Sequence, residues 1–115
     1  MTARSNEQTQ TSLIDLDREQ VKSLMEEGRI ILVDVREPHE FAAGHIPGSV
    51  SHPLSRFDPI ALPKDPARRI VFSCAAGVRS VHAAALARQA GRDVSEHYRG
   101  GFKDWLAAGE PVEVE

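Results

Sequence analysis

The chain has 115 residues, of which 41% are hydrophobic and 27% charged, and its formal net charge is −3. These values fit a single globular domain and exclude a second core of comparable size. Because 14 basic residues stand against 17 acidic ones, we expect no extended basic surface and no nucleic-acid partner. No apolar run approaches the ~20 residues that cross a bilayer, and the first dozen residues lack the apolar core of a secretory signal. We therefore expect a cytoplasmic protein without membrane contact.

Predicted strands and helices alternate along the chain. Residues 1–12 are polar and aperiodic, which predicts a flexible N-terminal tail ahead of a domain at 13–115. In the first half, the pattern predicts a strand at 12–16, a helix from 18 to about 28, a strand at 30–35, a short helix near 38–42 and a strand at 49–51. In the second half, it predicts a connector at 52–67 with a helical turn near 54–57, a strand at 69–73, a helix at 79–90, a strand at 94–98 and a helix at 102–108.

The order of these elements predicts an α/β fold. Regular alternation of strands and helices is typical of a mostly parallel sheet that is covered on both faces. The β-branched run at 30–35 is apolar at nearly every position, as in a strand buried on both sides. We expect a central, mostly parallel five-stranded sheet with helices on both faces.

Cys74 is the only cysteine of the chain. An internal disulfide, a dithiol couple and a multi-cysteine zinc site are therefore excluded. A lone cysteine among apolar neighbours is more often a small buried hydrophobe than a reactive group. Cys74, however, directly follows the predicted strand 69–73, and open α/β sheets bind ligands beyond the carboxyl ends of their strands. Its position therefore indicates function.

A tight loop and a helix N-terminus are predicted to follow Cys74. Gly77 is able to adopt the left-handed conformation, and the helix at 79–90 brings unpaired amides and the positive end of its dipole toward the sulfur. We expect these groups to lower the pKa of the Cys74 thiol, while Arg79 supplies a charge able to grip an oxyanion or a persulfide. The predicted site comprises the catalytic Cys74 and a substrate-binding loop of Ala75, Ala76, Gly77, Val78, Arg79 and Ser80.

The segment 74–80 resembles the active-site loop of rhodanese domains, in which a cysteine, a glycine and a terminal Arg-Ser pair recur at this spacing. Three further segments, at 32–41, 44–49 and 100–112, resemble the other signatures of that family in the same order. The resemblance covers the chain from about residue 13 to 112 and implies a rhodanese-like fold.

The resemblance implies a thiosulfate sulfurtransferase. The Cys74 thiolate would take the outer sulfur of thiosulfate or of a persulfide donor, hold it as a persulfide, and pass it to cyanide, a thiol or a protein acceptor. No metal or organic cofactor is implied. Some rhodaneses carry basic residues just after the cysteine, whereas Ala75 and Ala76 are uncharged; weak binding of thiosulfate is therefore expected.

Two other functions remain open on the sequence. One is a partner-dependent sulfur-relay or interaction module, whose Cys74 reacts only when a partner protein docks. The other is a small phosphatase or arsenate reductase, because these enzymes also hold an oxyanion between a cysteine and an arginine. The phosphatase loop has five residues between the two, whereas four separate Cys74 from Arg79, and a shorter loop favours a sulfur atom over a phosphate.

Other polar residues are predicted to have structural roles. Asp34 and Arg36 end a buried strand, where a carboxylate and a guanidinium more often fix loops than catalyse, so we expect them to support the site. His45 lies in a Gly- and Pro-rich turn and is expected to hydrogen-bond backbone. The remaining histidines have no metal-ligand spacing, so no metal site is expected; they are His39, His52, His82 and His97. Phe102 and Trp105 are predicted core anchors of the last helix.

Overall fold

A computed structural model describes residues 13–115 and contains one five-stranded sheet. The predicted tail at 1–12 lies outside the described residues. All four strand pairs are parallel and the strand order is β1-β5-β4-β2-β3, so the predicted sheet is confirmed. Its strands are β1 (Ile14–Leu16), β2 (Ile30–Asp34), β3 (Val50–Ser51), β4 (Arg69–Ser73) and β5 (Glu96–Tyr98).

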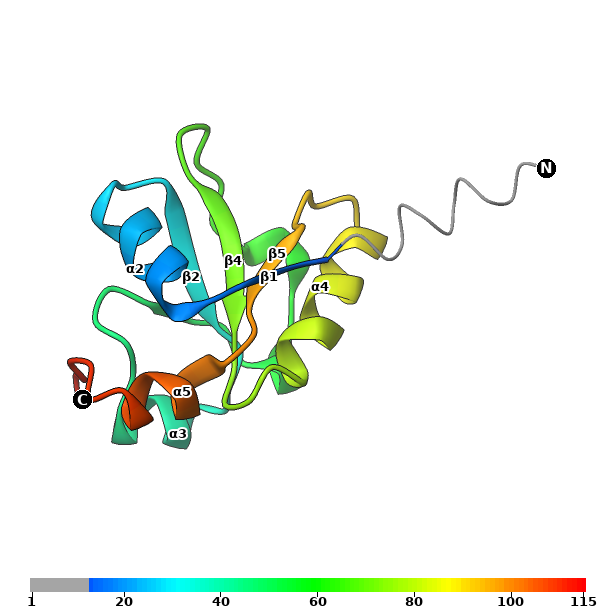
Figure 1. Cartoon of the computed structure of the whole chain (residues 1–115). Coiled ribbons are helices and arrows are strands. Elements are labelled where there is room, and N and C mark those ends of the chain that lie inside the picture. Colours follow the sequence, from blue (N-terminus) through cyan, green and yellow to red (C-terminus); the bar gives the residue numbers. More distant parts are fainter. Residues whose placement is uncertain (1–12) are drawn as a thin grey trace.

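Helices cover both faces of this sheet, as predicted. The α-helices are α2 (Arg18–Glu26), α3 (Pro38–Ala43), α4 (Arg79–Gln89) and α5 (Gly101–Ala107), and two 3₁₀ turns are η1 (Leu54–Arg56) and η2 (Pro59–Ala61). α4 lies on one side of the sheet, and α2 and α5 lie on the other (Figure 1). None of the helices at 13–115 is long and apolar enough to span a bilayer.

Alternation along the central strands divides the core into two clusters. In β4, Phe72 packs in the cluster on the α4 side, while the adjacent Val71 packs in the cluster with α2 and α5. The alanines that α4 buries are small, which lets its backbone lie close to the sheet; they are Ala83, Ala84 and Ala87. Phe102 and Trp105 of α5 belong to the opposite cluster, which confirms their predicted role as core anchors.

The ends of several elements follow local signals in the sequence. The Asp17 side chain accepts from the Gln20 amide at 2.9 Å and the Gln20 side chain accepts from the Asp17 amide at 2.8 Å, which is the predicted capping box at the start of α2. β5 is shorter than predicted because the chain turns at Val94, whose amide bonds back to Arg92. The turn η2 was not predicted, although the Asp58 side chain caps it at the amide of Ile60.

The chain connections change direction between β2 and β4. These two strands are neighbours, but β2 is followed by β3 at one edge of the sheet, and β4 is followed by β5 on the other side. Divergent connections of this kind mark the topological switch point at which open α/β sheets bind ligands. The loop between β4 and α4 lies at this end of the sheet, close to α5 and α3 (Figure 1).

Candidate active site

Cys74 is the first residue after β4, and the loop that follows returns the chain to α4 within five residues. The turn depends on Gly77, whose φ is +83°, a conformation that costs a residue with a side chain. A Cβ on Gly77 would also overlap the carbonyl oxygen of Arg99. Glycine is thus required here both for its backbone conformation and for close packing against the segment after β5.

The loop amides converge on the cysteine sulfur. The amide of Gly77 lies 3.1 Å from Cys74 Sγ and the amide of Ser80 lies 3.3 Å from it. The Ser80 hydroxyl oxygen is 3.5 Å from the same sulfur. Burial opposes the thiolate, but hydrogen bonds from the Ser80 side chain and from the amides of Ser80, Ala76 and Gly77 outweigh it, so the pKa of Cys74 is lowered.

α5 fixes the orientation of the loop peptides from the other side. The carbonyl of Cys74 accepts from the amide of Phe102 at 2.8 Å, and the carbonyl of Ala75 accepts from the amide of Lys103 at 3.0 Å. Because these carbonyls are directed to α5, the amides that follow are free to face the sulfur. A Cβ at Gly101 would collide with both carbonyl oxygens, so this contact also requires glycine.

Cys74 is nearly enclosed, with an exposed fraction of 1%. The rim around it is more open, since Val78 is 75% exposed and Ala76 is also exposed. The sulfur therefore lies at the bottom of the loop, packed on apolar residues from below and bonded to amides from above.

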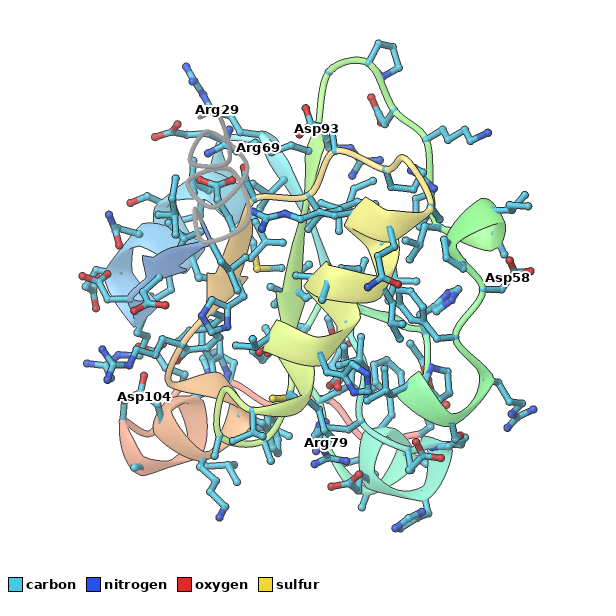
Figure 2. All side chains as sticks on the ribbon, turned by 90° about the vertical axis from the view of Figure 1, so that its right-hand side faces the viewer. Arg29, Asp58, Arg69, Arg79, Asp93 and Asp104 are labelled. Carbon is cyan, nitrogen blue, oxygen red and sulfur yellow. The ribbon has the colours of Figure 1, made fainter. Side chains whose placement is uncertain are left out.

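Arg79 does not touch the sulfur but pairs with Glu40 of α3. Its Nη1 and Nη2 atoms donate to Glu40 Oε1 and Oε2 at 2.7 and 3.1 Å. The hydrogen bond from Arg79 lowers the pKa of Glu40 to about 2, against a smaller opposing effect of burial. Arg79 lies at the end of the molecule where α4 begins, and Arg29, Arg69 and Asp93 lie at the opposite end (Figure 2).

Asp34 and Arg36 form a buried pair that holds the segment after β2. The Asp34 carboxylate accepts from the Arg36 backbone amide at 2.9 Å and from Nη2 at 2.8 Å. Arg36 Nη2 also donates to the carbonyl of Gly44 at 2.8 Å, and its guanidinium lies 4.3 Å from the centre of the Phe102 ring. The pair thus joins the end of β2 to the end of α3 and to α5.

His45 lies apart from the sulfur. Its Nδ1 is 2.8 Å from the carbonyl oxygen of Phe41, and its ring stacks on the Phe41 ring at 3.8 Å. The ring therefore bonds to backbone, as the sequence predicted.

A comparison with known protein families gives a match over most of the chain. A family model described as a rhodanese-like domain matches residues 17–108. The chain belongs to the rhodanese-like domain family. The resemblance drawn from its four motifs is thereby confirmed, and so is the predicted fold.

Relatives of this rhodanese-like domain include named sulfurtransferases. Human thiosulfate:glutathione sulfurtransferase is 34% identical in an alignment 102 positions long, and the match covers 76% of this chain and 88% of the human protein. An uncharacterized Synechocystis protein is 38% identical over 104 residues, 90% of this chain and 58% of that protein. The solved structure of a human single-domain sulfurtransferase matches with 33% identity and a TM-score of 0.69, over 81% of this chain and 95% of that one. These likenesses support a transferase of the rhodanese type.

Two residues beside the site were missed in the sequence. His97 on β5 lies with its Nδ1 2.9 Å from Ser80 Oγ, and its Nε2 is 2.7 Å from Asp15 Oδ1 on β1. From the sequence, His97 was considered only for a metal site, and none was expected. The available signal was its place in a predicted strand of a parallel sheet that also holds the strand before Cys74.

Proposed function

We propose that this rhodanese-like domain is a sulfurtransferase in which Cys74 carries a sulfane sulfur as a persulfide. The observation that carries the proposal is the position of Cys74 Sγ, within hydrogen-bonding distance of the Gly77 and Ser80 amides and at the carboxyl end of a central strand. Amides that stabilise a thiolate without neutralising it leave a strong nucleophile.

The reaction has two displacement steps. The Cys74 thiolate attacks the outer sulfur of thiosulfate, a new S–S bond forms, and the bond to the sulfonate sulfur breaks so that sulfite leaves with the electron pair. A thiophilic acceptor then attacks the outer sulfur of the persulfide, and the Cys74 thiolate leaves. Charge returns to the same sulfur in each cycle, where the loop amides stabilise it. Neither step needs a cofactor.

Thiosulfate and a small thiol are the first donor and acceptor to examine, because human thiosulfate:glutathione sulfurtransferase is among the relatives. Within the loop 74–80 an anionic donor meets little free positive charge, since Ala75 and Ala76 are uncharged and Arg79 is paired with Glu40. An oxyanion must compete with the Glu40 carboxylate for the guanidinium. We therefore propose weak use of thiosulfate and better use of persulfide donors.

The test is direct persulfidation. The chain is incubated with thiosulfate and its intact mass is measured. We expect a gain of one sulfur atom, removed by cyanide and absent in Cys74→Ala. Persistence of the gain in Cys74→Ala would refute the assignment of the nucleophile, and absence of any gain with thiosulfate and with a small-molecule persulfide would refute the enzymatic function.

A partner-dependent sulfur relay is the second candidate. It is favoured by the 1% exposure of Cys74 beneath a rim that includes the 75% exposed Val78, an arrangement in which a docked protein opens the way to the sulfur. In that case the mass gain requires a persulfidated protein donor, and small donors give none.

A further inference from the structure

A line of hydrogen-bonding groups runs from the cysteine sulfur to the surface. Cys74 Sγ is 3.5 Å from Ser80 Oγ, which is 2.9 Å from His97 Nδ1, and His97 Nε2 is 2.7 Å from Asp15 Oδ1. Ser80 and His97 are buried, whereas the side chain of Asp15 is 51% exposed. The line therefore connects an enclosed thiol to a carboxylate that water reaches.

The donors and acceptors along this line allow two protonation states. An ionised carboxylate only accepts, so His97 Nε2 must carry a proton toward Asp15. If His97 is neutral, Nδ1 accepts the single hydroxyl proton of Ser80, and Ser80 Oγ accepts the thiol proton. If His97 is an imidazolium, Nδ1 donates to Ser80 Oγ, and the hydroxyl is turned to donate to a thiolate. Every hydrogen bond is retained in both states.

We propose that His97 takes up the thiol proton of Cys74 through Ser80, with Asp15 fixing the ring. The S–H bond breaks as an O–H bond forms on Ser80, and the original O–H bond of Ser80 breaks as an N–H bond forms at Nδ1. One proton moves from sulfur to nitrogen and no electron is transferred. His97 and Asp15 are positioning residues, because neither touches the reacting sulfur. The inference rests on the proposed function, in which the thiolate is the nucleophile.

The groups that face His97 come from β1, α4 and β4. Asp15 faces the ring from β1 and Ser80 faces it from α4, while Cys74 lies on the other side of the Ser80 hydroxyl. β4 places the apolar Phe72 opposite His97 in the register of the sheet. Arg99 lies 3.5 Å from the other oxygen of Asp15 and is largely exposed. A buried imidazolium is costly without a paired charge, and Asp15 supplies that charge.

The pH dependence of Cys74 alkylation by iodoacetamide tests the relay. In His97→Gln and Asp15→Asn we expect the profile to move to higher pH, with a rate on the acidic side that is lower by about tenfold per pKa unit and an unchanged rate at high pH. The matched controls are His82→Gln, which removes an exposed histidine of α4, and Asp93→Asn, which makes the same charge change at the far end of the molecule (Figure 2). Profiles of His97→Gln and Asp15→Asn that coincide with wild type would overturn the proposal. A rate that falls equally at every pH would also overturn it, because that is the effect of a merely structural role.

A second measurement leaves His97 in place. The imidazole nitrogen shifts of His97 are titrated in the wild-type chain and in Cys74→Ala. We expect the imidazolium to lose its proton at lower pH in Cys74→Ala, because the thiolate that stabilises it is gone. Identical titrations would overturn the relay. Neither measurement uses sulfur transfer. If Cys74 is not persulfidated but the His97 titration depends on Cys74, the function is rejected and the relay stands. If Cys74 is persulfidated but the His97 titration does not depend on Cys74, the relay is rejected and the function stands.

Discussion

Gly77→Ala should both destabilise the fold and disturb the sulfur site. Gly77 has a φ of +83°, and an added Cβ would overlap the carbonyl oxygen of Arg99. That carbonyl belongs to backbone and cannot rotate away as a side chain would. The loop has to move instead, and with it the Gly77 amide that lies 3.1 Å from Cys74 Sγ.

Two costs add at this position. The left-handed conformation costs a residue with a Cβ roughly 1–2 kcal/mol, and overlap in a packed region costs roughly 1–3 kcal/mol. The expected loss in free energy of unfolding is therefore about 2–5 kcal/mol, from the sum of these two ranges. For mid-range values, a loss of about 3.5 kcal/mol and a urea dependence of about 2 kcal/mol per molar, the unfolding midpoint should fall by about 2 M.

Gly91→Ala is the matched control. Gly91 has a φ of +85°, but no atom lies within 4 Å of a Cβ added there. Urea unfolding of both variants therefore separates the conformational cost, which they share, from the overlap with Arg99, which belongs to Gly77 alone. Only Gly77→Ala should also raise the pKa of Cys74, measured by the ultraviolet absorbance of the thiolate. Equal losses of stability in the two variants, with equal thiolate titrations, would refute the close packing of this loop.

Three further predictions concern the charges and the hydroxyl around the sulfur. Ser80→Ala should raise the pKa of the Cys74 thiol, because one hydrogen bond to the sulfur is lost while the backbone amide remains; the thiolate absorbance measures this, and an unchanged pKa would contradict it. Arg79→Ala should lower kcat/KM for thiosulfate by about tenfold, the equivalent of one charge-assisted hydrogen bond of about 1.5 kcal/mol. The loss should be smaller for uncharged donors. Glu40→Gln should instead raise kcat/KM for thiosulfate, because the carboxylate that competes for Arg79 is gone. Arg79 also lowers the pKa of Glu40 from its ordinary 4.5 to about 2. The stability that this pair contributes is therefore present above pH 4.5 and is lost as the pH falls toward 2. Acid unfolding of Glu40→Gln should lack that part of the pH dependence.

Much of the fold could be predicted because its signals are local. The capping box of Asp17 and Gln20, the apolar run of β2 and the alanines of α4 each lie within a few residues of the structure they specify. The position of Cys74 after a central strand is also a local property. The lowered pKa of Cys74 could be expected for the same reason, since three of its four stabilising groups are amides of the next six residues.

What could not be predicted depends on pairing between distant segments. His97 meets Asp15 only because β5 pairs with β1, 82 residues away in the chain. Arg79 meets Glu40 across 39 residues. The sequence indicated a charge on Arg79 but not that a carboxylate from α3 already holds it. No local pattern specifies which strands pair or which helices lie side by side, so neither contact was predicted.

The enclosure of Cys74 would ordinarily indicate an inert structural cysteine, because burial raises a thiol pKa. What reverses this here is the direction of a few peptide groups. The amides of Phe102 and Lys103 bind the carbonyls of Cys74 and Ala75, and this contact commits the loop to present its next amides to the sulfur. α5 thus helps to stabilise the thiolate although none of its side chains bonds to the sulfur, and the same enclosure that excludes water strengthens each of those hydrogen bonds.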